Sequence, residues 1–219
     1  MKKYYYALMI CFFSLVCGCK TNEDKADDLI LEYMQKTLYD IESYSKIETN
    51  VTVAKSTWYN DTLCRNLVSQ LNIALDDFLK MSNEMNDAKE HMDIWGPPTS
   101  YSSSRSDQKY YEYKHKFEKC VTKAKVRFTI CKVFVDKLKE CTNQLDTSKV
   151  IGWEIMHRFR CKTQGGYSTI GNYRLVMDKD FSTIIFCDDL DSEEVKKKLE
   201  AYSMTKDNWE EFSKQIEKW

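Results

Sequence analysis

The chain has 219 residues, of which 33 are basic and 34 acidic, so its net charge is −1. Hydrophobic residues make up 42%, which is enough to build a core, and only 6 glycines and 2 prolines exclude collagen-like and proline-rich proteins. The balanced charge argues against a dedicated nucleic-acid-binding protein, and the length suits one domain with or without a smaller lobe.

The N-terminus has the pattern of a secretory signal peptide. Lys2 and Lys3 supply a short basic region, and an apolar stretch follows at residues 4–18. This stretch is too short for a comfortable membrane span, which needs about 20 residues. We therefore expect residues 1–18 to be a signal peptide.

The end of this stretch, LVCGC at residues 15–19, resembles the lipobox of bacterial lipoproteins. Val16 stands where leucine is usual, three residues before the cysteine. The resemblance implies that Cys19 becomes the first residue of the mature chain and carries acyl chains, palmitate among them, on its sulfur and amine. Each buried CH₂ contributes about 0.8 kcal/mol, so several chains anchor a protein firmly. The alternatives are an ordinary cleaved signal peptide and an uncleaved anchor.

Residues 19–28 are polar and are expected to form a lipidated tether. Lys20 and the acids that follow it resemble the export signal that sends some Bacteroidota lipoproteins to the cell surface, although a solvated spacer explains them equally well. The stretches at 36–49, 91–104 and 150–166 resemble uncharacterised lipoproteins of gut Bacteroidota. These resemblances imply a lipid-anchored protein of the bacterial cell envelope, in the outer membrane, facing either the periplasm or the cell surface.

Residues 29–146 read as a helical region built around a long hairpin. Asn60-Asp61-Thr62 is an N-cap cluster, and Gly96-Pro97-Pro98 ends the helix that it begins. A second helix is expected at about 107–145, capped by Ser106 or Asp107. Apolar residues in both helices alternate between steps of three and four, which is the seam of a coiled coil. The seam positions are Cys64, Leu67, Leu71, Ala74, Phe78, Met81, Met85, Ala88, Met92 and Trp95, then Phe117, Val121, Ala124, Phe128, Cys131, Val135 and Leu138.

A third helix is expected before the hairpin, at residues 24–44. Leu31, Met34, Leu38 and Ile41 share one of its faces, so we expect it to pack along the hairpin and form a three-helix bundle. A compact bundle is the alternative to the long hairpin. Residues 45–59 are rich in β-branched side chains and are expected to cross between elements as an extended segment.

Residues 147–219 are expected to form a small three-stranded antiparallel sheet and a C-terminal helix. From Ile151 to Thr163 the hydrophobic period is two, which places Arg158 and Arg160 on a solvated basic face. Gly165-Gly166 ends this strand, and two more strands follow at 173–178 and 182–187. Asp191 and Ser192 open the terminal helix, and the tail at 205–219 is expected to dock on the sheet. The predicted fold class is therefore α+β.

The cysteines of the mature chain form no CxxC pair, which gives no support for a zinc or redox motif. In an antiparallel hairpin that pairs Trp95 with Tyr110, Cys64 lies opposite Cys141. We expect each cysteine to pack in the core as a small hydrophobic residue. Because an exported protein meets an oxidising compartment, a disulfide between Cys64 and Cys141 is the alternative hypothesis.

Other candidate sites have simpler structural explanations. His157 lies on the apolar face of the first strand and is expected to be a hydrogen-bonded core residue. Asp188, Asp189 and Asp191 suit a solvated turn better than a calcium site. Residues 101–113 place tyrosines at the hairpin tip, where they suit a polar loop or contact with a protein or glycan. Asp61-Thr62-Leu63 resembles the O-glycosylation motif of Bacteroidota, which would make Thr62 a glycan acceptor.

We expect a non-enzymatic binding or structural lipoprotein, in which the hairpin holds a contact surface away from the membrane. Its partners would be the membrane, through the lipid anchor, and an unknown protein or glycan, without nucleic acid, metal or cofactor. The alternative is an extracytoplasmic enzyme with an unrecognised site on the sheet, acting on cell-wall or host glycans. Its candidate residues are Glu154, Arg158, Arg160 and Asp178.

Overall fold

The computed structural model describes residues 20–216, and these form two compact units. The first, the sheet unit, contains the described residues up to Lys55 together with Val150–Asp191. The second, the hairpin unit, contains Ser56–Lys149 and the chain from Ser192 onward. The α+β class is confirmed. The two units do not follow the predicted boundary near residue 146, because each combines segments that are far apart in the sequence.

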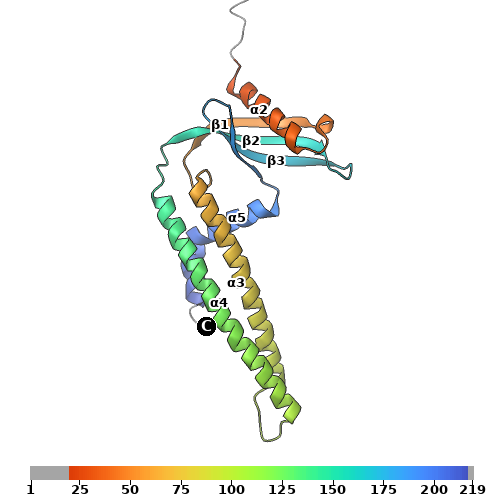
Figure 1. Ribbon diagram of the computed structural model, residues 1–219, viewed down its shortest axis with the longest axis vertical. Coiled ribbons are helices and arrows are strands. Elements are labelled where there is room, and N and C mark those ends of the chain that lie inside the picture. Colours follow the sequence, from red (N-terminus) through yellow and green to blue (C-terminus); the bar gives the residue numbers. More distant parts are fainter. Residues whose placement is uncertain (1–19, 217–219) are drawn as a thin grey trace, which may run out of the picture. The chain divides into compact units, whose positions relative to one another are not determined.

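The hairpin unit is built on α3 (Thr62–Trp95) and α4 (Ser104–Asn143), drawn yellow and green in Figure 1. Asp61 caps α3 by accepting a hydrogen bond from the Cys64 N–H at 2.9 Å, and Gly96 ends the helix with a φ of 63°. The start of α4 differs from the prediction. Ser103 is the cap, because its Oγ accepts from the Ser106 N–H at 3.2 Å.

The predicted seam forms the core between these two helices. The rings of Phe78 and Phe128 lie 5.9 Å apart at its centre. The seam loosens toward the hairpin tip, where Met92 is half-buried and Trp95 is exposed. The buried seam residues are Cys64, Leu67, Leu71, Ala74, Phe78, Met85, Ala88, Ala124, Phe128, Cys131, Val135 and Leu138.

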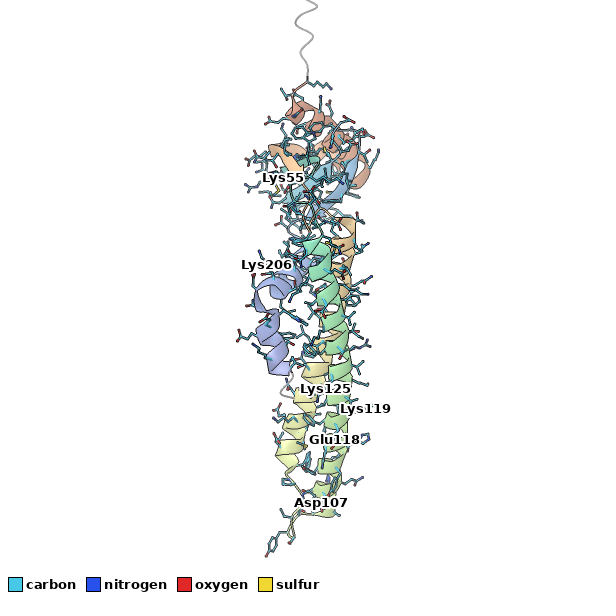
Figure 2. All side chains as sticks on the ribbon, turned by 90° about the vertical axis from the view of Figure 1, so that its left-hand side faces the viewer. Lys55, Asp107, Glu118, Lys119, Lys125 and Lys206 are labelled. Atoms are coloured by element: carbon cyan, nitrogen blue, oxygen red, sulfur yellow. A yellow bond between two sulfur atoms is a disulfide. The ribbon has the colours of Figure 1, made fainter. Side chains whose placement is uncertain are left out.

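The C-terminal helices cover the hairpin core. They are α5 (Glu193–Ser203), a π-helical turn (Met204–Asn208) and α6 (Trp209–Ile216). Trp209 stacks on Phe128 with ring centres 5.6 Å apart, and Phe212 contacts Phe78 edge-on at 5.8 Å. Figure 2 shows α6 beside the hairpin, and Glu118, Lys119 and Lys125 along α4. The predicted docking of the tail on the sheet is therefore wrong, since its aromatic side chains join the hairpin core instead.

The sheet has four antiparallel strands instead of the predicted three. They are β1 (Ser45–Lys55), β2 (Val150–Lys162), β3 (Ser168–Met177) and β4 (Ile184–Asp189), in that order across the sheet. Residues 45–55, predicted to cross between elements, pair with β2 along their length, with Thr49 opposite His157. Their β-branched side chains suit this pairing, but local sequence could not identify a partner about a hundred residues away.

The N-terminal helix α2 (Asn22–Thr37) belongs to the sheet unit, where it lies across one face of the sheet (Figure 1). It buries Ala26, Ile30 and Met34, which join a core with Phe159 and Leu175. The predicted three-helix bundle is therefore wrong. Residues 22–28, assigned to the tether, are the first turns of this helix, which begins at a capping box.

Atoms are tightly packed around the two central strands, β2 and β3. A Cβ atom on Gly171 of β3 would lie 2.6 Å from the ring of Phe159 on β2. A Cβ atom on Gly152 would lie 1.9 Å from the Met177 carbonyl oxygen. These two positions require glycine because a larger residue would displace a buried ring or the backbone.

Candidate functional site

The predicted lipidation site and signal peptide lie outside the described residues, so both stay predictions. The described chain begins at Lys20, and Thr21 already caps α2 by accepting from the Asp24 N–H at 3.1 Å. In the sequence, Cys19 is two residues before this cap. Among residues 20–216, no helix is long and apolar enough to span a bilayer.

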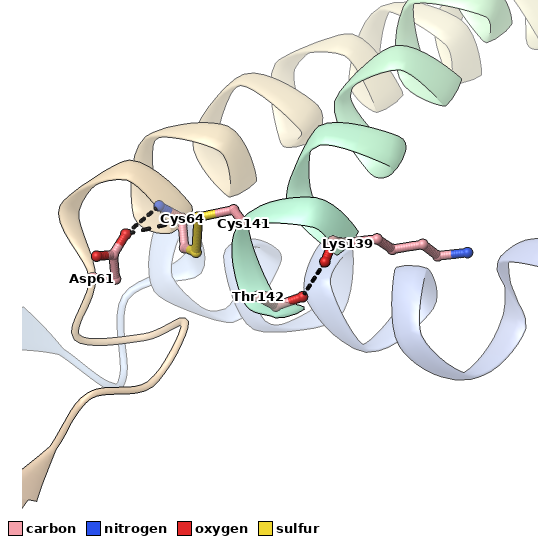
Figure 3. The surroundings of a disulfide bond; sticks show 5 residues. All are labelled: Asp61, Cys64, Lys139, Cys141 and Thr142. Carbon is pink, nitrogen blue, oxygen red and sulfur yellow. Dashed lines mark hydrogen bonds between the residues drawn. A yellow bond between two sulfur atoms is a disulfide. The ribbon is translucent and has the colours of Figure 1, made fainter. Parts of the chain in front are cut away.

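The disulfide that was the alternative to core packing of Cys64 and Cys141 is present at the open end of the hairpin (Figure 3). Cys64 in the first turn of α3 is bonded to Cys141 in the last turn of α4, with their Cα atoms 6.2 Å apart. Asp61 Oδ1 lies 3.9 Å from the Cys141 sulfur. These three residues place carboxylate and sulfur atoms close together, but the sulfurs are bonded to each other. The cluster therefore acts as a covalent clamp on the hairpin.

Thr62, the predicted glycan acceptor, is the first residue of α3 and is exposed. Its neighbour Asp61 is occupied as the helix cap. Glycosylation of Thr62 stays a prediction.

His157 is a buried, hydrogen-bonded residue under α2. Its Nε2 lies 2.9 Å from the Tyr44 hydroxyl, and its Nδ1 lies 3.0 Å from the Thr49 hydroxyl. Thr49 donates to Asp27 of α2 at 2.9 Å, and Lys46 is ion-paired with the same carboxylate. The prediction of a satisfied core histidine is confirmed. Its partners were not foreseen, because they come from segments about a hundred residues away.

Hydrogen-bond balance assigns the protonation of this group. Thr49 gives its only hydroxyl proton to Asp27, so its oxygen accepts from the His157 Nδ1–H, and Nε2 accepts from Tyr44. Burial lowers the pKa of His157 to about 4 and raises the pKa of Tyr44 to about 12. Both side chains are therefore neutral near pH 7 and have a structural role.

The free cysteines are poorly suited to nucleophilic catalysis. Cys120, Cys131 and Cys161 are buried and Cys187 is half-buried. Burial raises the pKa of Cys131 and of Cys187 to about 11, which disfavours the reactive thiolate.

The acids proposed for an enzyme are engaged in structural contacts. Glu154 accepts a hydrogen bond from the Arg174 guanidinium at 2.7 Å, as an ion pair. Asp178 accepts from the Ser182 N–H at 2.7 Å and from its hydroxyl, which fixes the turn between β3 and β4. These hydrogen bonds lower the pKa of Asp178. Neither carboxylate is arranged as an acid–base pair with a nucleophile.

The face of the sheet opposite α2 has a different character. Arg158, Arg160 and Lys162 alternate along β2 with the buried residues of the α2 face, and all three are exposed. We call these three residues the cationic row. None of them has an ion pair within the described chain, whereas Lys20, Lys36, Lys46 and Arg174 are each paired with an acid.

Two shallow hollows border the cationic row. One, of about 160 Å³, is lined by Glu48, Asn50, Met156, His157, Arg158, Asn172 and Tyr173. The other, of about 390 Å³, is lined by Asp40, Glu42, Ser43, Arg160, Cys161, Lys162 and Ser168. The basic face of β2 was predicted from its alternation. Its neighbours on β1 and β3 were not, because strand pairing brings them together.

Two other candidate regions have their own contacts. Asp189 accepts from the Asp191 N–H at 3.0 Å, and Asn172 donates to the Asp191 carboxylate at 2.6 Å, so these acids belong to a hydrogen-bonded turn. At the hairpin tip, Tyr101 is 98% exposed. His91 stacks on Tyr113 with ring centres 4.7 Å apart.

Comparison of the chain with protein-family models, with curated proteins and with solved structures gives no match. The functional argument therefore rests on the residues of this chain.

Proposed function

We propose that this protein is a lipid-anchored component of the bacterial cell envelope that acts by binding, without catalysis, through the open face of the sheet unit. The observation that carries the binding role is the cationic row, three exposed and unpaired cations on one rigid strand. The groups that would suit catalysis, His157, Glu154 and Asp178, are held in structural contacts. The anchor is supported by the lipobox-like end of the N-terminal apolar stretch.

The hairpin unit has a structural role in this proposal. Its helices of 34 and 40 residues are about 50–60 Å long at 1.5 Å per residue. A covalent clamp at one end and the aromatic contacts of α6 limit their separation.

The anchor is tested by labelling cells with a palmitate analogue while expressing the full chain or its Cys19→Ala variant. We expect label on the full chain and none on the variant. Label that persists without Cys19, or a full chain that never takes up label, would overturn the lipid anchor. Protease added to intact cells then distinguishes the cell surface, where the protein is cleaved, from the periplasmic side, where it is protected.

The binding role is tested with the full-length protein in detergent, mixed with envelope fragments of the producing cell from which the lipids have been extracted, so that the anchor has no bilayer to enter. We expect the protein to sediment with the fragments. A variant with Arg158→Gln, Arg160→Gln and Lys162→Gln should stay in solution. The matched control carries Lys132→Gln, Lys137→Gln and Lys139→Gln on the exposed side of α4, which removes the same charge. Equal sedimentation of both variants would exclude the open face as the binding surface.

A further inference from the structure

We propose that the cationic row binds an acidic glycan, a linear polysaccharide whose carboxylates are spaced by neutral sugar hydroxyls. This inference rests on the proposed binding function and names its ligand class. The juxtaposition that carries it is a row of unpaired cations bordered by two hollows on a sheet face that α2 leaves open.

The row is a preorganised array of charge. Alternate residues of a strand lie about 6.7 Å apart on one face, so Arg158 to Lys162 spans about 13 Å. Strand β2 is held between β1 on one side and β3 on the other, with Arg158 opposite Glu48 and Asn172. Guanidinium groups bind carboxylates through paired hydrogen bonds. A linear ligand with repeated carboxylates can therefore meet several cations at once.

The acids beside the cationic row disfavour ligands with a high density of negative charge. Glu48 lies opposite Arg158 and accepts a hydrogen bond from Asn50 at 2.8 Å, and Glu42 lines the hollow next to Arg160. These carboxylates would repel a densely charged polymer such as nucleic acid. A glycan with sparse carboxylates places charge near the row and neutral hydroxyls near the acids. Acids also accept hydrogen bonds from sugar hydroxyls.

The surroundings of the row also fit a sugar. Asn50, Asn172 and Ser168 line the hollows with amide and hydroxyl groups. Beyond Lys162, the turn between β2 and β3 carries Tyr167, which is 78% exposed. An exposed ring has one apolar face and a polar tip, which suits contact with a sugar.

The position of α2 argues against the anchoring bilayer as the ligand. The start of α2 lies near the turn between β3 and β4, where Lys25 sits 6.0 Å from the centre of the Phe181 ring. The chain that follows α2 reaches the far end of β2, where Ser43 Oγ accepts from the Lys162 N–H at 2.8 Å. A 16-residue helix spans about 24 Å, so Thr21, the cap of α2, lies at the other end of the sheet and beside its other face. The proposed anchor residue, Cys19, is two positions before Thr21 in the sequence.

The test measures binding of full-length protein in detergent to immobilised polygalacturonate, with neutral dextran, duplex DNA and immobilised glycerol phosphate, the head group of an anionic lipid, as alternatives. We expect binding to polygalacturonate that weakens at least tenfold between low and 0.5 M salt, and weaker binding to the other three. Variant R158Q/R160Q/K162Q should lose at least tenfold in affinity. The K132Q/K137Q/K139Q control should match the unmodified protein.

A second variant keeps the test informative if the triple variant folds poorly. Glu48→Gln removes an acid beside the row and should strengthen binding to polygalacturonate severalfold, an effect that loss of folding would not produce. Equal affinity of the triple variant and its control, or no gain with Glu48→Gln, would overturn the inference. Preference for glycerol phosphate or DNA would overturn the glycan while leaving the proposed binding function intact. Failure of the envelope sedimentation test would instead remove the binding function itself.

Discussion

The main contacts of the two units differ in how far apart in the sequence their partners lie. In the hairpin unit, α3 and α4 are consecutive helices, so their seam residues meet once the chain turns back after Gly96. In the sheet unit, β1 pairs with β2 although α3 and α4 lie between them in the sequence. The two long helices of the hairpin unit therefore follow a repeated local pattern, which one disulfide closes and the distant C-terminal helices cover. The sheet itself cannot form without pairing between distant segments.

Removing the disulfide clamp should produce the largest difference in stability between the two units. Cys64 and Cys141 are 77 residues apart, and closing such a loop reduces the entropy of the unfolded chain by an amount equivalent to about 4.5 kcal/mol at room temperature. We expect the double variant Cys64→Ala and Cys141→Ala to lower the free energy of unfolding of the hairpin unit by about 2–4 kcal/mol. Hydrogen exchange in denaturant, followed separately for α4 and β3, measures this.

Thiol alkylation provides the matching control. In unreduced, denatured protein we expect Cys64 and Cys141 to be protected and Cys120, Cys131, Cys161 and Cys187 to react. Alkylation of Cys64 and Cys141 without reductant would contradict the clamp. A Cys187→Ala variant, which removes a half-buried free thiol, should leave the exchange of α4 unchanged.

Overpacking the core of the sheet unit should produce the next largest loss of stability. Gly171→Ala would place a Cβ atom 2.6 Å from the Phe159 ring, and overpacking of this kind costs about 1–3 kcal/mol. We expect the loss in β2 and β3 and not in α4. Adding Phe159→Leu should make the effect of Gly171→Ala smaller, because the ring that clashes is gone. Additive losses in this double variant, measured by chemical denaturation, would rule out the clash.

Acid should weaken the sheet unit through His157. Its pKa is about 4 in the folded protein and about 6.5 in the unfolded chain, so the unfolded state binds more protons between these values. Stability present above pH 6.5 is therefore lost as the pH falls toward 4, by about 1–3 kcal/mol. Hydrogen exchange of β2 across this range measures it.

The variant Tyr44→Phe tests whether His157 controls this loss of stability. The change removes the hydroxyl that donates to Nε2, a hydrogen bond that favours the neutral ring, so the His157 pKa rises toward 6.5 and the loss of stability in acid becomes smaller. The charges that face this group are Asp27, which accepts from Thr49, and Lys46, which is paired with Asp27. A pH profile identical to that of the unmodified protein would show that His157 does not control the transition.

The smallest expected effect is at the cap of α3. Asp61→Ala removes the acceptor for the Cys64 N–H and should cost about 1 kcal/mol, confined to the hairpin unit. Asp61→Asn keeps a capping oxygen and should restore most of the loss in thermal denaturation. A loss of several kcal/mol would mean that Asp61 also supports the disulfide.

Much of the candidate site was visible in the sequence, but its neighbours were not. The period of two in β2 predicted that Arg158 and Arg160 face solvent and that His157 faces the core. The same pattern does not indicate which strands pair with β2. Glu48 and Thr49 therefore entered the site only with the strand register.

Local sequence was sufficient to predict the features that depend on neighbouring residues: the cap and the glycine end of α3, the seam, and the register that places Cys64 opposite Cys141. Which surfaces pack together depends on the tertiary structure. An apolar helix face shows that α2 must pack against something, but not whether that partner is a hairpin or a sheet. The aromatic residues of the C-terminal tail also show that it must pack against an apolar surface, but not that this surface is the hairpin core. Burial is favourable against any complementary apolar surface, so the partner is selected by the whole fold.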